Sequence, residues 1–539
     1  MPTSSHLFLG VAWPYASGPR HVGHLAGAYL PADVVARASR LAGDHVLLVS
    51  GSDQYGTPIT VAAEREGVPP QELADRNHEA IAATFVRAGI TFDHYTKTSS
   101  PTHHRTVTAL FERLHAGGFV VEGTQEVAWC PAHGRSLPDR YVEGRCPRCG
   151  AEGARGDQCD GCGATLEPAD LVDPRCRSCG APAELRPLRQ LVLALDRLQP
   201  AVAAWLDRSR HGWSRPWVVE DALGDLRTGL RGRAITRDLA WGVGVPLPGW
   251  GDRRFYVWFD AVIGYLSATV EWAERAGRPD AWQRWWCGEG TTHRYYVGKD
   301  NVWFHALWWP AILLGASSAD GSKRLHLPDD VVASHHLTEA GAQLSTSRGH
   351  GTTLDDAFDR WGVDPVRHAV ASLAPESADV ELTVDAVEGA TRSGLLGGIA
   401  NPAHRVASLW WRRFGTEAVP EPSAAETEAA TAALGEVATH LRAARLRKGL
   451  AAVHAIGRTV NRRLAAEEPW KRPDDDARAG LAALLPWVDA LAIAAWPIVP
   501  ETAGNIRAAL GRTPAPSSWA LPDGPARLAG EPAPPLRAR

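Results

Sequence analysis

The motif His21-Val22-Gly23-His24 contains residue types that could handle a nucleotide, because two imidazoles flank a glycine there. Gly23 lets a phosphate approach the backbone closely, since glycine has no side chain in the way. His21 and His24 can donate hydrogen bonds to a phosphate whose negative charge grows as a new bond to phosphorus forms. The motif is short, and an ordinary helix start is its alternative interpretation.

Four C-x-x-C or C-x-x-H pairs lie between residues 130 and 179, and they contain seven of the eight cysteines. They are Cys130/His133, Cys146/Cys149, Cys159/Cys162 and Cys176/Cys179. Two such pairs complete a tetrahedral zinc site, so two zinc ions are implied. Disulfides are the alternative, and the reducing cytoplasm disfavours them.

The two inner pairs, from Cys146 to Cys162, are close enough in sequence to share one ion, so the two outer pairs must share the other. We expect both ions to be structural and to do no chemistry. They hold together an insertion that has too few apolar residues to fold alone.

The elements that position the histidine motif can be read from hydrophobic periodicity. An apolar run over residues 7–11, a Pro/Gly-rich turn and a helical run over 25–41 are typical of the first β–α unit of a doubly wound α/β domain. Phosphate would then lie over the helix N-terminus. A second buried strand is expected to end just before Asp53, and residues 68–116 have helical periodicity.

The block of residues 12–24 resembles the first signature of class I aminoacyl-tRNA synthetases, and Pro14-Tyr15-Ala16-Ser17-Gly18 resembles the methionyl branch. The resemblance covers residues 6 to about 510. It implies a class I Rossmann-like α/β nucleotide-binding domain that is split by a zinc-knuckle insertion and followed by an all-α anticodon-binding helical bundle. It also implies ATP-dependent ligation of L-methionine to tRNA(Met) through methionyl-adenylate, with Mg²⁺ and structural Zn²⁺.

The resemblance implies a methionine pocket. Its residues are Trp13, Tyr15, Asp53, Trp258, Ala261, Tyr265, Phe304 and His305. A carboxylate at position 53 suits the α-ammonium of the amino acid, and aromatic rings pack well against a thioether sulfur. A turn or capping role for Asp53, and a core role for the aromatic residues, are the alternatives.

The resemblance also implies the nucleotide site. The ATP-binding residues are His21, Gly23, His24, Gly298, Lys299, Asp300 and Thr346, and the catalytic residues are His21, His24, Ser345, Ser347 and Arg348. An aspartate at the carboxyl end of a strand, as expected for Asp300, is well placed to accept hydrogen bonds from a ribose.

The second class I signature departs from the family pattern. Gln343-Leu344-Ser345-Thr346-Ser347-Arg348-Gly349 aligns with it, and Gln343 and Thr346 stand where the family has lysines. Neutral side chains stabilise a departing pyrophosphate less than cations do. The sequence therefore predicts slow adenylate formation, in which Arg348, Lys299 and Mg²⁺ carry the positive charge.

Two further features of the family have counterparts here. Residues 137–144 resemble the linker between the zinc knuckles, but His133 stands where the family usually has cysteine, so the outer site is expected to be the weaker one. Asn401, Arg405, Pro469 and Trp470 match the positions that read the CAU anticodon. A tryptophan can stack on an unstacked base while Asn and Arg bond its edge; solvated helix surface is the alternative.

The expected domains follow the order of these blocks. They are 1–116 (first half of the catalytic domain), 117–235 (zinc-knuckle insertion), 236–330 (second half), 331–390 (stem-contact segment with the signature loop), 391–513 (helical anticodon-binding domain) and 514–539 (Pro-rich tail, poorly ordered or draped on the surface). Helices are expected around residues 191–209, and no strand is expected beyond Pro375.

The composition limits the partners. The formal net charge of −4 excludes a broadly basic surface, so tRNA must be met by its acceptor end and anticodon at local patches. We find no signal peptide and no apolar stretch of the ~18 residues that a membrane span needs, so a cytoplasmic monomer without membrane contact is expected. Alternatives to the ligase are an inactive paralogue that senses tRNA or methionine, an inhibitor-resistant isozyme, or an activator of another amino acid.

Overall fold

A five-stranded parallel sheet forms the centre of the molecule in this computed structural model, which describes residues 5–156, 159, 161–162, 164, 166–320, 324–344 and 351–533. Its strands, in spatial order, are β14 (Asp330–Ser334), β13 (Thr291–Gly298), β1 (His6–Val11), β2 (His45–Ser52) and β3 (His94–Lys97). The chain adds strands on one side of β1 and later on the other, so the topological switch point lies between β1 and β13. In such sheets ligands bind at the carboxyl ends of the strands beside this point.

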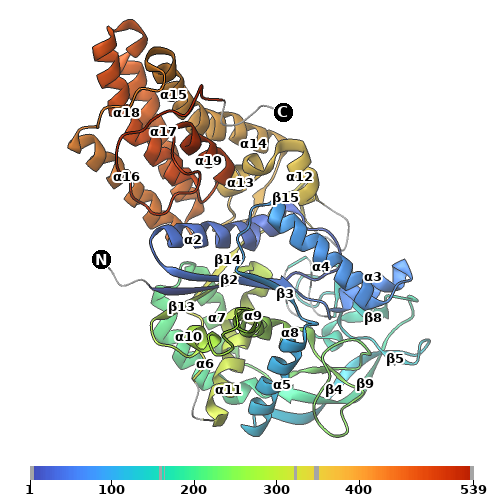
Figure 1. Cartoon of the computed structure of the whole chain (residues 1–539). Coiled ribbons are helices and arrows are strands. Elements are labelled where there is room, and N and C mark those ends of the chain that lie inside the picture. The colour runs from blue at the N-terminus through green and yellow to red at the C-terminus, as the bar shows by residue number, and fades with distance from the viewer. Residues whose placement is uncertain are drawn as a thin grey trace.

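Helices cover both faces of the sheet (Figure 1). The expected helix over residues 25–41 is present, but it begins with α1 (Val22–His24) and a π-helical turn (Leu25–Tyr29) before α2 (Leu30–Leu41). Leu7, Leu9 and Val11 of β1 pack on the α2 side, and Phe8 packs on the opposite side. The sheet is therefore buried on both faces, as a parallel sheet requires.

The helical structure predicted for residues 68–116 is only partly correct. Helices α4 (Pro70–Arg87) and α5 (Pro101–Ala116) are present, and α3 (Thr57–Glu66) precedes them. The edge strand β3 interrupts them with the sequence His-Tyr-Thr-Lys, and it pairs with β2 from Val49 to Ser52. Such a short, polar strand has too little apolar alternation to be recognised in a sequence.

The insertion is built on a long antiparallel pair, β4 (Val120–Cys130) and β9 (Glu184–Leu193), with short β5 (Arg135–Ser136) and β10 (Arg233–Ala234) at its edges. The knuckles lie between them around β6 (Val142–Arg145), β7 (Ala154–Arg155) and β8 (Val172–Cys176). Helices α6 (Leu195–Ser209) and α7 (Pro216–Thr228) follow. The expected helix around 191–209 therefore begins later, because residues up to Leu193 extend β9.

The chain then returns to the central domain. This segment contains β11 (Thr236–Arg237), β12 (Arg254–Phe255), α8 (Val257–Asp260), a 3-10 turn (Ala261–Ile263), α9 (Gly264–Arg275) and α10 (Trp282–Trp286). After β13 come a 3-10 turn, η6 (Lys299–Asn301), a π-helical turn (Phe304–Trp308) and α11 (Trp309–Asp320). Helices α5, α9 and α11 pack together beneath the sheet.

A small sheet and a helical bundle complete the chain. The small sheet contains β15 (Leu337–Glu339), β16 (Ala342–Gln343) and β17 (Val380–Glu381), so the expectation of no strand beyond Pro375 is wrong at β17, which pairs with β15. The helices are α12 (Leu354–Trp361), α13 (Val363–Ser372), α14 (Val384–Gly389), a π-helix (Ala390–Ala400), α15 (Asn401–Phe414), α16 (Ala424–Arg442), α17 (Leu446–Glu467), η10 (Pro469–Lys471), α18 (Asp474–Ala495) and α19 (Pro500–Ala509). Figure 1 shows the bundle on the α2 side of the sheet and the insertion at the opposite end.

Helix α18 is long and apolar enough to cross a membrane by length and composition, which the sequence analysis did not anticipate. However, 72% of its most apolar window is buried inside the protein. It packs against α15, α16 and α17, so it is the core helix of the bundle. After α19, the described part of the tail, residues 514–533, runs along the surface, where Trp519 Nε1 donates to the carbonyl of Ala38 on α2 at 2.7 Å.

Candidate active site

The histidine motif lies at the switch point of the sheet. His21 precedes α1, and the ring centroids of His21 and His24 are 3.8 Å apart. Burial, and next the charges of His21 and Arg20, hold the pKa of His24 well below its ordinary value, so its imidazole is neutral at pH 7. A neutral imidazole still has one N–H to donate to a phosphate.

Arg20 is a site residue that sequence reasoning missed. It is buried, its Nη2 donates to the carbonyl of Gly18 at 2.7 Å, and its Nη1 lies 3.2 Å from His24 Nε2. Its position directly before His21 could have indicated this role, because an arginine beside a phosphate-binding motif can stabilise the charge of the phosphate.

The expected carboxylate of the amino-acid pocket lies at the carboxyl end of β2. Asp53 is buried, its Oδ1 accepts from the Tyr55 N–H at 3.1 Å, and its backbone pairs with that of Tyr15. Burial raises the pKa of Asp53 well above its ordinary range, and the nearby carboxylate of Asp260 raises it further. A bound ammonium group would reverse this shift, so the site has the electrostatics of a cation receptor.

Asp260 is a second pocket residue that the sequence analysis did not single out. Its carboxylate has no side-chain hydrogen-bond partner among the described residues. Burial holds its pKa well above the usual value, although its own backbone N–H and that of Ala261 oppose the shift. His103 Nε2 lies 3.9 Å from it, and burial lowers the pKa of His103 to about 3, so this imidazole is neutral. The sequence pattern that could have identified Asp260 is a single acidic residue within the apolar run of residues 255–263.

The aromatic side chains that the sequence predicts for the pocket wall form two contacting pairs. Trp258 and Phe304 are stacked with their centroids 3.9 Å apart and an interplanar angle of 8°. Tyr265 donates its hydroxyl to His305 Nε2 at 2.8 Å, while His305 Nδ1 donates to the carbonyl of Asn301 at 2.8 Å. Because burial lowers the pKa of His305 to about 4, the ring is neutral, in the tautomer that carries its proton on Nδ1.

Two more pocket candidates lie close to this wall. Ala261 is buried at the start of the turn after α8, and Trp13 follows β1. The Trp13 ring fills the space beside Gly264, where an added Cβ would come within 2.8 Å of it. The structure thus brings the sequence-predicted pocket residues to one region, at the ends of β1, β2 and β13.

The nucleotide candidates lie at the end of β13. Gly298 pairs with Ser334 at the end of β14, and η6 follows with Lys299 and Asp300. Lys299 Nζ contacts the Asp379 carboxylate at 2.7 Å, and His336 Nε2 lies 3.1 Å from Asp300 Oδ2. Lys299 therefore already has an anionic partner, which the sequence analysis could not foresee, and His336 was missed.

The second signature begins on the β15–β16 hairpin. Gln343 pairs with Thr338, but Ser345, Thr346, Ser347 and Arg348 lie outside the described residues. Both flanks of the segment contact the histidine motif. Leu344 would lie 2.8 Å from a Cβ added to Gly23, and the carbonyl of Thr352 accepts from the Val22 N–H at 3.2 Å.

The eight knuckle residues form two clusters with the nested pairing that the sequence predicts. In the inner cluster Cys146 and Cys162 sulfurs are 3.9 Å apart, and those of Cys149 and Cys159 are 3.7 Å apart. In the outer cluster Cys130 lies 3.6 Å from Cys179 and 3.3 Å from His133 Nδ1, and Cys176 joins them. Zinc–sulfur bonds of ~2.3 Å in a tetrahedron give sulfur separations of about 3.8 Å, so both donor sets fit a zinc ion.

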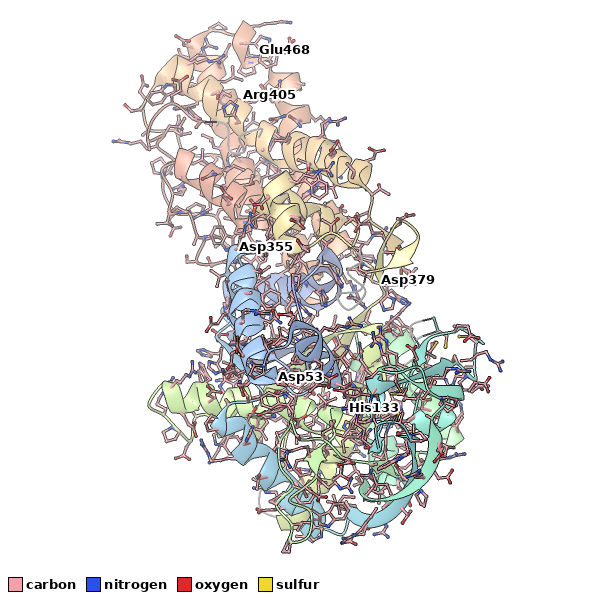
Figure 2. All side chains as sticks on the ribbon, turned by 90° about the vertical axis from the view of Figure 1, so that its right-hand side faces the viewer. Asp53, His133, Asp355, Asp379, Arg405 and Glu468 are labelled. Carbon is pink, nitrogen blue, oxygen red and sulfur yellow. The ribbon has the colours of Figure 1, made fainter. Side chains whose placement is uncertain are left out.

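The anticodon candidates lie far from these sites. Asn401 and Arg405 are exposed on α15, and Trp470, 46% exposed, lies in the turn after α17. Pro469 is buried, and its carbonyl accepts from Arg413. Figure 2 shows Arg405 and Glu468 near the far end of the bundle, whereas Asp53 and His133 lie in and beside the central domain.

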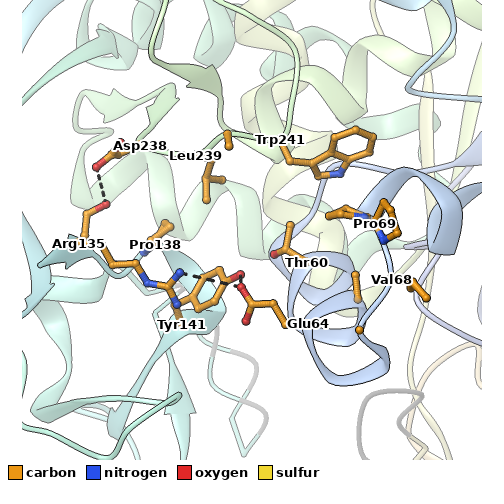
Figure 3. Close-up of a pocket in the computed structure, with 15 residues that line it drawn as sticks. Thr60, Glu64, Val68, Pro69, Arg135, Pro138, Tyr141, Asp238, Leu239 and Trp241 are labelled. Carbon is orange, nitrogen blue, oxygen red and sulfur yellow. Dashed lines mark hydrogen bonds and ion pairs between the residues drawn. The ribbon is translucent and has the colours of Figure 1, made fainter. Parts of the chain in front are cut away.

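A cavity of about 670 Å³ opens between α3 and the insertion (Figure 3). Its lining includes Glu64, Tyr141 and Trp241, and Tyr141 donates to Glu64 Oε1 at 2.8 Å. Trp241 Nε1 donates to the carbonyl of Gln54 at 2.9 Å, directly after Asp53. The cavity is therefore linked through Trp241 to the segment that follows β2.

Comparison with known proteins agrees with this geometry. The sequence profile described as tRNA synthetases class I (M) matches residues 7–407. A methionine–tRNA ligase of a Roseiflexus species is 43% identical over 97% of this chain and 91% of its own length, and that of Bifidobacterium animalis is 42% identical over 88% and 78%.

Solved structures share the fold. Mycobacterium tuberculosis methionyl-tRNA synthetase in complex with methionyl-adenylate superposes with a TM-score of 0.78 at 24% identity, over 99% of each chain. Since the sequence profile covers most of the chain and the relatives are more than 40% identical over most of it, the chain belongs to the methionyl-tRNA synthetases of class I.

Proposed function

We propose that this chain ligates L-methionine to tRNA(Met) with ATP, through methionyl-adenylate. The observation that carries the proposal is that the same domain holds a buried Asp53 carboxylate at the carboxyl end of β2 and the stacked rings of Trp258 and Phe304, the latter in the segment after β13. A carboxylate suits the α-ammonium, and aromatic faces suit an unbranched thioether. Tyr15, Trp13, Ala261, Tyr265 and His305 complete the proposed pocket.

The first step is attack by the methionine carboxylate on the α-phosphorus of ATP. A carboxylate oxygen forms the new bond to phosphorus, and the bond from the α-phosphorus to the bridging oxygen breaks, so pyrophosphate leaves with the electron pair. No proton need move. The protein therefore contributes positioning and charge stabilisation, with His21 and the neutral His24 donating to the phosphate. Mg²⁺, bound with the ATP phosphates, supplies further positive charge.

Gly23, Gly298, Lys299 and Asp300 are the proposed contacts to ATP, with Thr346 of the signature loop. We propose that Ser345, Ser347 and Arg348 of the same loop are catalytic residues. Lys299 forms an ion pair with Asp379, which offsets part of its positive charge. This supports an adenylate step that is slower than in a lysine-bearing loop, because the pyrophosphate meets fewer unpaired cations.

In the second step a hydroxyl of the terminal ribose of tRNA attacks the methionyl carbonyl carbon. The bond from that carbon to the phosphate oxygen breaks, so AMP leaves with the electron pair and the hydroxyl proton is released. We propose that the acceptor end reaches the pocket from the cavity between α3 and the insertion, because Trp241 joins the two. At the other end of the molecule, we propose that Trp470 stacks on an anticodon base while Asn401 and Arg405 contact base edges beside Pro469. The exposure of Trp470, Asn401 and Arg405 supports this assignment.

We propose two structural zinc ions, one in each knuckle cluster, and a monomeric protein of the cytoplasm, where translation takes place. The domain bounds that fit this scheme are 1–116 and 236–330 for the catalytic halves, 117–235 for the insertion, 331–390 for the stem-contact segment, 391–513 for the bundle and 514–539 for the tail. The end of α5 at Ala116 and the start of β4 at Val120 support the first of these bounds.

The test is ATP–pyrophosphate exchange with methionine and a panel of analogues, followed by charging of a tRNA(Met) transcript. Methionine-dependent exchange and charging are expected, and Asp53→Asn should abolish both. Exchange with a different amino acid would indicate a specialised activator. Tight tRNA binding without any exchange would indicate an inactive paralogue, and either result would overturn the proposal.

A further inference from the structure

Arg233 lies between the zinc-knuckle insertion and the wall of the amino-acid pocket. On the insertion side, its Nε forms an ion pair with Glu167 Oε1 at 2.8 Å, and its Nη2 donates to the carbonyl of Leu166 at 3.4 Å. The Arg233 side chain is 12% exposed and that of Glu167 is 35% exposed. The guanidinium is thus held, rather than freely solvated, by a segment that follows the inner cysteine cluster.

On the other side, the guanidinium carbon of Arg233 lies over two aromatic rings. It is 5.0 Å from the centroid of Trp303 and 6.0 Å from that of Phe304. Phe304 is in turn stacked on Trp258 at 3.9 Å. The side chains therefore follow one another as carboxylate, cation, aromatic ring and aromatic ring, from the insertion to the pocket wall.

Each contact in this series restricts the next one. A guanidinium is attracted to the face of an aromatic ring by the ring's quadrupole. The ion pair with Glu167 limits the rotation of Arg233, so the cation stays over the rings. A Phe304 rotamer that turned the ring away would lose both the cation and the stacking on Trp258.

We propose that Arg233 is a positioning residue that sets the affinity for methionine by fixing the Phe304–Trp258 wall from the insertion side. The inference rests on the proposed function, because it takes this wall to receive the methionine side chain. A wall held in its binding geometry loses less conformational freedom when the substrate binds. The contacts that the structure describes for Arg233 are with Leu166, Glu167 and the two rings, not with the histidine motif, so we expect the effect on KM for methionine and not on kcat.

A neighbouring arginine shows why Arg233 is the testable residue. Arg237 also joins the insertion to an aromatic ring, since it contacts Asp139 Oδ1 at 3.3 Å and lies 3.8 Å from the Tyr256 centroid. However, the acidic and aromatic partners of Arg237 are both buried, since Asp139 is 4% and Tyr256 1% exposed, so its removal would destabilise the region. Arg233 lies on the edge strand β10, and its partner Glu167 is 35% exposed, so a variant there is better tolerated.

The chain offers a matched control. Arg189 forms an ion pair with Glu122 at 2.7 Å and lies 4.5 Å from the centroid of Trp250, on the β4–β9 pair of the insertion. The residue types are the same, although this ion pair is more exposed, and Trp250 does not contact the Trp258–Phe304 stack in any ring pair of the described residues. Arg189→Met thus removes an acid–arginine–aromatic series without touching the pocket wall.

The experiment compares Arg233→Met, Arg233→Lys, Glu167→Gln and Arg189→Met with the parent protein. Methionine-dependent pyrophosphate exchange gives kcat and both KM values, and methionine titration followed by tryptophan fluorescence gives affinity without turnover. Arg233→Met should raise KM and Kd for methionine roughly threefold to thirtyfold, as expected for a lost cation–π contact. The values of kcat and KM for ATP should stay within about twofold, and Arg233→Lys should be intermediate.

Two results would overturn the inference. One is a methionine KM in Arg233→Met that matches Arg189→Met. The other is a parallel fall of kcat and of affinity for ATP and methionine, which would mean that Arg233 only supports the fold. Absence of methionine binding in the parent protein would overturn the proposed function instead, so the two failures are distinguishable.

Discussion

At the scale of single residues, the Asp53–Asp260 pair has the most unusual electrostatics in the pocket. Both carboxyl groups are buried, burial raises the pKa of each, and the charge of Asp260 raises that of Asp53 further. Asp53 could be predicted from the sequence because it follows a strand within a resembled block. Asp260 could not be predicted, because its role depends on its proximity to Asp53, a residue in a distant segment of the sequence.

The raised pKa of Asp53 predicts a pH dependence of methionine binding. The free protein binds a proton that the complex gives up, since an adjacent ammonium favours the ionised carboxylate. Affinity should therefore fall as pH falls through the free-state pKa, and binding near that pH should release protons. Calorimetry in buffers of different ionisation enthalpy measures the release, and KM for methionine at successively lower pH measures the affinity. A flat profile without proton release would show that Asp53 is already ionised.

The signature loop yields a second prediction. Gln343 offers only a neutral group, and Lys299 shares its charge with Asp379 at 2.7 Å. Gln343→Lys should therefore speed methionine-dependent pyrophosphate exchange by about tenfold or more, since an electrostatic donor is typically worth ~10²–10³ in such sites. Arg348→Ala should abolish it. An exchange rate that is indifferent to Arg348, or that falls in Gln343→Lys, would mean that the loop works with neutral groups.

The exposed ring of Trp470 yields a third prediction. Trp470→Ala should lower kcat/KM for tRNA charging roughly tenfold to a hundredfold, as expected when one base loses its stacking partner, and leave pyrophosphate exchange almost unchanged. Leu185→Ala is a suitable control, because Leu185 is another exposed large apolar residue, 43% exposed, but on the insertion. Equal losses in exchange and charging would make Trp470 a residue of the bundle core.

At the scale of elements, long periodic segments could be predicted and short ones could not. The helix over residues 25–41 and the strand over 45–52 have strong apolar patterns. Strands β3 and β17 are set by partners elsewhere in the chain, and the π-helical turn at Leu25–Tyr29 lies inside a continuous helical run, where four of its five residues are buried. The knuckles could be predicted fully in their pairing, because spacing alone limits which pairs can share an ion.

The knuckle clusters yield a fourth prediction. The purified protein should contain close to two zinc ions per chain, and a rising concentration of chelator should remove the outer ion first. The outer cluster has His133 in place of a fourth thiolate, and a neutral ligand stabilises the cation less. Metal analysis of the protein and of Cys176→Ser checks this. One ion whose occupancy is unchanged in Cys176→Ser would show that the outer cluster binds none.

At the scale of the whole molecule, one buried arginine joins three parts of the chain. Arg367 on α13 pairs with Asp33 on α2 at 2.7 Å, and both side chains are fully buried. The same guanidinium donates to the carbonyl groups of Ala88, Pro497 and Ile498 at 2.7–3.0 Å. It thereby ties the catalytic domain to the end of α18. No local pattern reveals this, because Asp33 and Arg367 are 334 residues apart.

Arg367 yields the last prediction, which concerns stability. Removing Arg367 leaves the buried Asp33 carboxylate with only its Arg37 and Thr91 partners, and it leaves the carbonyls of Ala88, Pro497 and Ile498 without their donor, so Arg367→Ala should lower the free energy of unfolding by about 3–5 kcal/mol. Arg76→Ala, which breaks an ion pair with Glu66 whose side chains are 53% and 47% exposed, should change it by less than about 1 kcal/mol. Denaturant titration of both variants measures the difference.

Arg367 bonds both the catalytic domain and the bundle, so a substitution that removes only some of its contacts should loosen the connection between these two parts before either part unfolds. Arg367→Lys, which keeps one donor and the charge, should therefore lose charging more than pyrophosphate exchange, whereas equal losses would mean that Arg367 holds the catalytic domain alone.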